Sequence, residues 1–328
     1  MSQNTVLVIK DLEVELYSEK GPLPVIDKVN LSIKEGEIVG IVGESGCGKS
    51  MLASAIMNLL NSPAKIAAGT IFYDGQDMTT LSSKEFQKIR GNEISMIFQE
   101  PMTSLNPLMK VGKQIEEAIK AHEKATNAEL KERAIAAIRE VGIPQPEKVY
   151  HDIPSRLSGG MRQRIMIAMA LVCHPKLLIC DEPTTALDVT IQAQILRLIK
   201  KLRDETNTAV IFISHDMGVI YQMVDRVVVM YAGQFVESAP CKKLFEKPLH
   251  PYTIGLQNAI PQINKQQSSL QDIPGSVPML DNLPEGCLFA PRCPFAKTEC
   301  FTKKVPLKHY DDHDVRCLLV DEGGWQNE

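Results

Sequence analysis

The sequence contains no apolar run that suggests a membrane-spanning helix, and it has no excess of basic charge. A spanning helix needs roughly 18 apolar residues, whereas the apolar runs at 177–180, 209–213 and 227–232 have the length of strands. The chain has 36 Lys and Arg against 40 Asp and Glu, which gives a net charge of −4. Because nucleic-acid binders usually carry a basic surface, we expect no nucleic-acid partner.

A secretory leader is also missing. The first residues, MSQNTVLVIKD, lack the positive charges and the long apolar stretch of a signal peptide. We therefore expect a cytoplasmic protein that reaches a membrane only through its partners.

Paired cysteines at the C-x2-C spacing usual for structural zinc are absent as well. In a cytoplasmic chain, cysteines are more often free thiols or metal ligands than disulfides. Three interpretations stay open for the four cysteines near the C-terminus, spaced C-x5-C-x6-C-x16-C: an iron–sulfur cluster, a zinc ion with His309 or His313 as further ligands, or unligated thiols. These cysteines are Cys287, Cys293, Cys300 and Cys317.

The chain does show an alternation of strand-like and helix-like segments. The buried-strand run at 38–42 leads through a glycine-rich stretch into a helical segment, and strand-like runs return further along. Leu130, Ala134 and Ile138 fall at helical spacing, and the charged stretch EEAIKAHEK predicts a solvated helix face. The alternation predicts an α/β fold with a mainly parallel sheet.

Residues 43–50, GESGCGKS, match the phosphate-loop pattern G-x-x-x-x-G-K-[ST]. Glycines let backbone N–H groups approach phosphates, and the following helix adds its positive end. Lys49 is expected to reach the β- and γ-phosphates of ATP, and the Ser50 hydroxyl to bind Mg²⁺. The residues predicted to contact the nucleotide here are Gly43, Glu44, Ser45, Gly46, Cys47, Gly48, Lys49, Ser50 and Met51.

Two further peptides carry chemistry. The apolar run at 177–180 ends in Asp181 and Glu182, and carboxylates after a buried strand are costly unless they are paired or bind a metal. In LSGGMRQ (157–163), Ser158, Gly159 and Gly160 precede a helical segment. They predict a second anion-binding helix N-terminus.

Together, the phosphate loop and LSGGMRQ resemble those of ABC ATPases, and the resemblance spans nearly the whole chain. It implies an ATPase domain at 1–260, built on a P-loop (RecA-like) core. An N-terminal antiparallel β subdomain and a helical subdomain at about 91–165 belong to that domain. A small Cys-rich C-terminal extension follows at 261–328.

The resemblance also implies roles for single residues. Asp181 holds Mg²⁺ and Glu182 polarises the attacking water, while Gln99 contacts both the Mg²⁺ and the water. His215, in FISHD, contacts the γ-phosphate, and Asp188 ends a D-loop (ALD, 186–188) that crosses a dimer interface.

In this family the peptide that corresponds to LSGGMRQ (157–163) is called the signature peptide. It completes the nucleotide site of the opposing subunit, which implies a head-to-tail dimer. Members usually stack an aromatic residue on adenine. Tyr17 is the candidate for this stacking, although Leu16 aligns at the same place and could pack there instead.

Several peptides resemble one branch, the oligopeptide/dipeptide/nickel importer ATPases of the D type: QEPMTSLNPL after Gln99, LSGGMRQR, HPYTIGL, IPGSVP and the APRCP run at 290–294. This branch implies a peripheral protein on the cytoplasmic face of the membrane that energises import of di- or oligopeptides. Its implied partners are a second, F-type ATPase, two permeases and an extracytoplasmic binding protein. For the four cysteines it favours a 4Fe–4S cluster.

The apolar stretch 102–109 is expected to dock on the permeases, so a charged residue at Leu105 or Leu108 should uncouple transport from hydrolysis. Two alternative functions stay open. The same subunit type could serve a nickel, metallophore or glutathione importer. A soluble ABC protein of translation or DNA maintenance would need a second ATPase module or a long coiled-coil or zinc-hook insertion, and the sequence shows neither.

Overall fold

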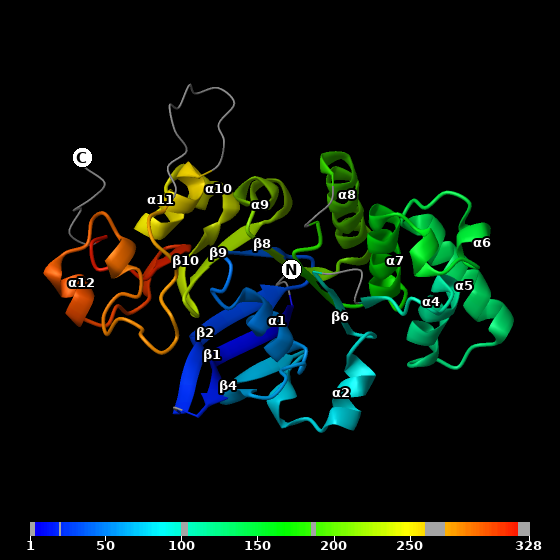
Figure 1. Cartoon of the computed structure of the whole chain (residues 1–328), viewed down its shortest axis with the longest axis horizontal. Helices are drawn as coiled ribbons and strands as arrows, with labels where there is room; N and C mark the ends of the chain where they lie inside the picture. Colours follow the sequence, from blue (N-terminus) through cyan, green and yellow to red (C-terminus); the bar gives the residue numbers. More distant parts are fainter. Residues whose placement is uncertain (1–3, 20, 100–103, 185–187, 260–272, 321–328) are drawn as a thin grey trace. The chain divides into compact units, whose positions relative to one another are not determined.

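The computed structural model of the chain describes residues 4–19, 21–99, 104–184, 188–259 and 273–320 (Figure 1). The predicted linker near residue 262, Ala186 and Leu187 of the predicted D-loop, and the stretch directly after Gln99 lie outside the described residues. The chain divides into two compact units, which are described separately. The first unit comprises Met1–Val6, Ile33–Glu37 and Asp77–Ile211, and the second comprises Leu7–Ser32, Ile38–Gln76 and Phe212–Glu328.

The second unit contains an antiparallel sheet with the strand order β2-β1-β4-β5 (Figure 1). Its strands are β1 (Thr5–Ser18), β2 (Gly21–Lys34), β4 (Ala64–Tyr73) and β5 (Gln76–Asp77). The two short strands predicted at 6–9 and 12–16 form the single strand β1, because a register shift between Lys10 and Glu13 keeps the pairing with β4 intact. Opposite this bulge, a Cβ on Gly69 would lie 2.3 Å from the Asp11 carbonyl oxygen, so the approach requires glycine.

The same unit contains a mixed sheet that includes C-terminal strands, in the order β11-β12-β10-β9-β3. The strands are β3 (Ile38–Val42), β9 (Arg226–Tyr231), β10 (Gln234–Pro240), β11 (Lys308–Tyr310) and β12 (His313–Val315). β3 and β9 run parallel, whereas β10 is antiparallel to both β9 and β12. All five residues of β3 are buried, as its unbroken apolar run predicted.

Short helices complete this unit: α1 (Lys49–Ile56), α9 (Met217–Met223), α10 (Cys241–Glu246), α11 (Pro251–Asn258), the 3₁₀ turn η3 (Ala290–Arg292) and α12 (Thr298–Thr302). A buried carboxylate connects the C-terminal part to β10. Glu237 accepts hydrogen bonds from the backbone N–H groups of Leu249 and His250, and its Oε1 lies 2.6 Å from His313 Nε2. We call residues 273–320 the C-terminal segment.

In the first unit, β6 (Ile94–Ile97) pairs in parallel with β7 (Leu177–Asp181). Its helices and turns are η1 (Met78–Thr80), α2 (Ser83–Ile89), α4 (Val111–Lys120), α5 (Asn127–Glu140), α6 (Pro146–Val149), η2 (Pro154–Arg156), α7 (Gly159–Leu171) and α8 (Val189–Thr206) (Figure 1). Leu130, Ala134 and Ile138 are all buried in α5, which confirms the predicted helical face. Strand β8 (Ala209–Ser214) follows α8. None of the described helices combines the length and the apolar character needed to cross a bilayer.

The prediction of a solvated face for EEAIKAHEK is wrong at one residue. Glu116 is fully buried in α4, where it accepts hydrogen bonds from Tyr150 Oη and, at 2.8 Å, from Lys113 Nζ. Burial alone would raise the pKa of Glu116, but these hydrogen bonds outweigh it and hold the pKa below its usual value. The carboxylate is thus a structural anchor between α4 and the Tyr150 ring.

Candidate nucleotide-binding site

The predicted phosphate loop connects β3 to α1, and two of its glycines, Gly43 and Gly48, lie where side chains would not fit. A Cβ on Gly43 would lie 2.2 Å from the Met230 carbonyl oxygen. Gly48 is the N-cap of α1 with φ of 108°, and no side chain caps the helix. The first N–H groups of α1 are therefore not used by a capping side chain and can serve an anion.

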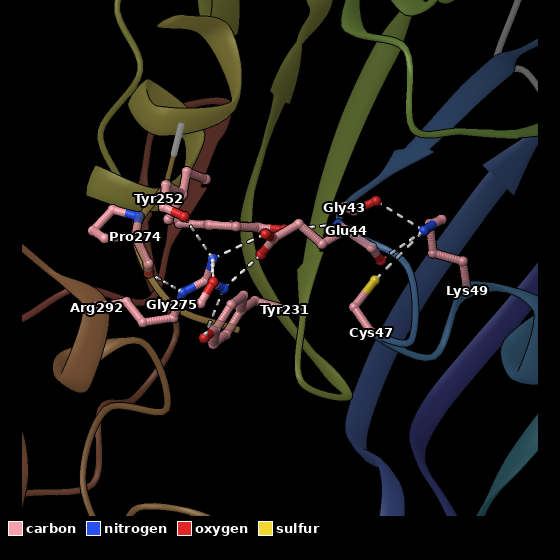
Figure 2. A network of polar contacts seen from close by, with 10 residues as sticks. Gly43, Glu44, Cys47, Lys49, Tyr231, Tyr252, Pro274, Gly275 and Arg292 are labelled. Atoms are coloured by element: carbon pink, nitrogen blue, oxygen red, sulfur yellow. Dashed lines mark hydrogen bonds and ion pairs between the residues drawn. The ribbon is translucent and has the colours of Figure 1, made fainter. Parts of the chain in front are cut away.

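Lys49 lies folded against its own loop, with only 5% of its surface exposed. Its Nζ donates to the carbonyl oxygens of Gly43 at 2.8 Å and Glu44 at 2.9 Å (Figure 2). Burial raises the pKa of the neighbouring Cys47 thiol, although Lys49 opposes the shift, so this thiol stays protonated at neutral pH. The Lys49 ammonium is thus held beside the loop by hydrogen bonds to uncharged carbonyl oxygens, which are weaker acceptors than a phosphate.

Two more predicted residues of the second unit are accessible. Tyr17 is exposed, and Lys65 Nζ lies 5.4 Å from the centre of its ring, whereas Leu16 is half-buried. His215 is exposed directly after β8, next to Asp216, whose side chain caps α9. Both rings are therefore exposed at the protein surface.

In the first unit, the structure brings the predicted Gln99 and Glu182 together. Gln99 Nε2 donates to Glu182 Oε2 at 3.2 Å. Glu182 has φ of 47°, in the left-handed region that non-glycine residues rarely adopt, and such strain is found mainly at functional sites. Asp181, the last residue of β7, is 5% exposed. Gln163 of α7 donates to the Pro183 carbonyl oxygen at 2.7 Å, which fixes the chain just beyond the two carboxylates.

The LSGGMRQ peptide forms the start of α7, where Ser158 and Gly159 are exposed. Ser158 caps the helix, because its Oγ accepts a hydrogen bond from the Met161 N–H at 3.2 Å. A Cβ on Gly159 would meet no atom within 4 Å. Asp188 caps α8 in the same way, with its Oδ1 2.9 Å from the Ile191 nitrogen. These two helix ends therefore have open space for another molecule.

In the stretch 102–109, predicted to dock on the permeases, one of the two leucines chosen for substitution is not at the surface. Leu105 is buried, with 3% of its surface exposed, so a charge there would disrupt folding before it tested docking. Leu108 is 89% exposed and stays a predicted contact residue. Met102 lies outside the described residues.

The four C-terminal cysteines all line one small cavity of about 20 Å³, together with His250. Burial raises the pKa of Cys293 to about 11 and that of Cys317 to about 12. As placed, no group of three or more His, Cys, Asp or Glu side chains among the described residues could hold a metal ion. The alternative histidine ligands lie against carboxylates instead: His309 Nδ1 is 2.5 Å from Asp314, and His313 is next to Glu237.

Sequence reasoning missed two residues that contact the phosphate loop. Arg292 forms an ion pair with Glu44, and Tyr252 Oη accepts a hydrogen bond from the Glu44 N–H at 2.8 Å (Figure 2). Both residues belong to peptides, HPYT and APRCP, that the sequence analysis used only as marks of a family. Nothing in the spacing of those peptides indicates a partner near residue 44.

Comparisons with known proteins agree with this geometry. Residues 26–185 match the family described as ABC transporter, and residues 236–300 match the family described as oligopeptide/dipeptide transporter, C-terminal region. The chain is 49% identical to the oligopeptide transport ATP-binding protein AppD of Bacillus subtilis over 98% of both chains. It is 45% identical to the dipeptide transport ATP-binding protein DppD of Escherichia coli, over 97% of this chain and 98% of that one.

A solved structure shares the fold. It is a dimeric ATP-binding cassette in a post-hydrolysis state, bound to ADP and phosphate, with a TM-score of 0.65 and 29% identity over 72% of this chain and 98% of that chain. The predicted α/β fold with an antiparallel β subdomain is thereby confirmed, and its main sheet is mixed. The chain belongs to the ATP-binding proteins of the oligopeptide/dipeptide family of ABC transporters, of the D type, and is an ATPase subunit of a peptide import system.

Proposed function

We propose that residues 43–51 bind Mg²⁺-ATP in this chain, while Ser158, Gly159 and Gly160 complete the nucleotide site of a partner ATPase. The observation that carries the proposal is the phosphate loop itself. Lys49 is stored on the carbonyl oxygens of Gly43 and Glu44, and the end of α1 has no side-chain cap.

Binding follows from these two features. A phosphate oxygen carries more negative charge than a carbonyl oxygen, so charge-assisted hydrogen bonds to it are stronger. Lys49 therefore exchanges its carbonyl partners for the β- and γ-phosphates, and the uncapped N–H groups of α1 donate to the same phosphates. The exposed Tyr17 ring stacks on adenine.

Hydrolysis is assigned to the residues that follow β6, β7 and β8. Glu182 accepts the proton of the attacking water, and the Gln99 amide, already bonded to Glu182, orients that water. General-base catalysis contributes roughly 10²–10⁴-fold to the rate in enzymes. His215 donates a hydrogen bond to the γ-phosphate as charge develops there.

Ser50, Gln99 and Asp181 would hold Mg²⁺, which neutralises phosphate charge when it is bound. Their chemistry fits, because Mg²⁺ prefers hydroxyl, amide and carboxylate oxygens. Asp181 is nearly buried, and a buried carboxylate is costly unless it has a cation or hydrogen-bond donors. Asp181 also interacts with other groups of the protein.

The partners follow from the family. An F-type ATPase forms the heterodimer, two permeases carry the peptide, and an extracytoplasmic binding protein delivers it, so that this chain acts at the cytoplasmic face of the membrane. The exposure of Ser158, Gly159 and Asp188 supports the proposed contact with the second ATPase. The names of the relatives, which specify oligopeptide and dipeptide transport, support a peptide cargo over nickel or glutathione.

Two substitutions test the assignment of roles. Glu182→Gln should keep the affinity for ATP and nearly abolish hydrolysis in the assembled transporter, because only the proton acceptor is lost. Lys49→Ala should instead weaken ATP binding itself, measured as the Kd of a fluorescent ATP analogue. Most turnover retained by Glu182→Gln, or normal ATP affinity in Lys49→Ala, would refute the proposed site.

We also propose that the four C-terminal cysteines hold a metal centre, a 4Fe–4S cluster. The support is that all four line one cavity, whose walls also include Phe289 and Leu319. Such a short segment has little core of its own, and a metal is a common way to stabilise one. The thiols must lose their protons to bind, because thiolates are the ligands of such clusters. They must also draw closer together, because as placed they could not hold a metal ion.

Purification without oxygen tests the cluster. We expect brown protein with about four irons and four sulfides per chain, and Cys293→Ser should remove the colour. Cys241→Ser is the control, since Cys241 is a buried cysteine on α10 that does not line this cavity. One zinc per chain and no iron would show that the cysteines bind zinc and not a cluster. Protein without any metal would refute a metal centre.

A further inference from the structure

A single arginine of the C-terminal segment reaches the phosphate loop. The Arg292 guanidinium forms a bidentate pair with Glu44: Nη1 lies 2.6 Å from Oε2, and Nη2 lies 2.9 Å from Oε1 (Figure 2). The Arg292 side chain is 5% exposed and that of Glu44 is 30% exposed. A forked, largely buried pair of this kind is stronger and more directional than a surface ion pair.

The other donors of Arg292 fix the guanidinium in place. Its Nε donates to the Pro274 carbonyl oxygen at 2.8 Å, and its Nη2 lies 3.3 Å from the carbonyl oxygens of Ile273 and Gly275. The Tyr231 ring lies below it, 5.8 Å from the guanidinium carbon. The arginine therefore acts as a rigid bridge whose position is set by residues 273–275 and by β9.

Glu44 is in turn held at three points. Arg292 binds its carboxylate, Tyr252 Oη accepts its N–H, and Lys49 donates to its carbonyl oxygen (Figure 2). The Tyr252 ring packs against Tyr231, with ring centres 4.7 Å apart. The second residue of the phosphate loop is thus set by residues from β9, from α11 and from the C-terminal segment.

The charge of Glu44 gives this arrangement a role beyond structure. A carboxylate in a phosphate loop repels a triphosphate, and it does so less when a guanidinium neutralises it. Lysine could supply the charge but not the fork that binds both carboxylate oxygens and the backbone carbonyls. Arg292 therefore removes a repulsion and holds the loop with the same set of hydrogen bonds.

We propose that Arg292 is a positioning residue of the nucleotide site. It neutralises the Glu44 carboxylate and thereby holds the phosphate loop in place. The C-terminal segment thus contributes to the affinity for ATP. This inference rests on the proposed binding of ATP by residues 43–51. It is independent of whether the neighbouring cysteines bind a metal.

The first test compares two arginines of the C-terminal segment in the full chain. Arg292→Met should raise the Kd of Mg²⁺-ATP about tenfold, the size expected when a charged hydrogen-bonded pair is broken. Arg316→Met is the matched control. Arg316 donates to the carbonyl oxygens of Phe235 and Val305 and does not contact the loop, so its loss should lower the melting temperature without changing the Kd.

The second test separates charge from folding. Glu44→Gln added to Arg292→Met should recover part of the lost affinity, at least about threefold, because it removes the uncompensated carboxylate. Arg292→Lys should lie between the parent and Arg292→Met. A purely structural arginine would give no recovery, and it would weaken binding in proportion to the fall in melting temperature.

Three results would overturn the inference: normal Kd in folded Arg292→Met, an equal loss in Arg316→Met, or no recovery in the double variant. If Arg292→Met does not fold, Arg292→Lys takes its place, alone and combined with Glu44→Gln, and the same comparisons apply. Lys49→Ala keeps the two proposals apart. Normal ATP affinity in Lys49→Ala refutes the site itself, whereas lost affinity there with normal affinity in Arg292→Met refutes only the role of Arg292.

Discussion

Two helices begin at peptides predicted to bind phosphate, and they begin differently. At α1 the N-cap is Gly48, in a left-handed conformation and without a side-chain cap. At α7 the N-cap is Ser158, whose Oγ already accepts a hydrogen bond from the Met161 N–H. No side chain caps the N–H groups at the start of α1, whereas a serine hydroxyl already binds one of those at the start of α7.

The difference suits the two proposed roles. A loop that holds ATP through a catalytic cycle gains from backbone donors that no capping side chain occupies. A peptide that meets the nucleotide of another subunit only in the closed dimer must be stable while it is apart, and a serine cap provides that stability. When the subunits close, the Ser158 hydroxyl can donate to a phosphate while its oxygen still caps α7.

Substitution of Gly48 should give the largest effect. In Gly48→Ala the new Cβ would lie 2.9 Å from the Met230 side chain, and φ of 108° is unfavourable for alanine. We expect a loss of about 1–3 kcal/mol of folding stability and weaker ATP binding, measured by urea unfolding and nucleotide titration. Unchanged ATP affinity would show that the shape of the α1 end is not what binds the phosphates.

Ser158→Ala should give a smaller effect, and one that acts between subunits. Loss of the cap should cost about 0.5–2 kcal/mol of stability. The Kd for ATP at the phosphate loop of the same chain should stay unchanged, while hydrolysis at the partner's site in the assembled heterodimer should fall. The readout is ATP turnover with the Lys49→Ala change placed in this chain, so that only the partner's site is active. Full turnover in that background would contradict the proposed contact.

Gly159→Ala should give the smallest change in folding. Open space surrounds the new methyl group, and alanine favours a helix over glycine by roughly 0.5–1 kcal/mol. The chain should therefore be as stable as the parent or slightly more stable by thermal unfolding. Hydrolysis in the heterodimer should nevertheless fall, because the methyl group projects into the space proposed for the partner's nucleotide. A loss of stability similar to that of Gly48→Ala would remove the contrast between the two helix ends.

The sequence predicted those parts of the molecule in which neighbouring residues determine the structure. The strand at 38–42, the glycine loop and α1 follow from local chemistry, and all are present as expected. The periodic apolar face of α5 was predicted for the same reason. Gln99 and Glu182, whose roles the family resemblance implied, are hydrogen-bonded to each other in the structure.

The features that were missed depend on residues far apart in the chain. Glu116 is buried because Tyr150, 34 residues away, donates to it, and no periodic pattern marks such a pair. Leu105 lies in an apolar stretch that suits a docking surface and a core equally well, and the structure places it in the core. The four cysteines could be recognised as a group, but their spacing could not show that they would line one cavity.

The bridge between Arg292 and Glu44 joins residues 248 positions apart, which bears on how the protein is made. During synthesis the phosphate loop leaves the ribosome long before its anchoring arginine, so a nascent or prematurely ended chain has the loop without Arg292. If Arg292 tightens ATP binding as proposed, a nascent chain would gain that affinity only after residue 292 has been made. Early synthesis would then yield a phosphate loop that binds ATP more weakly than the loop of the folded protein.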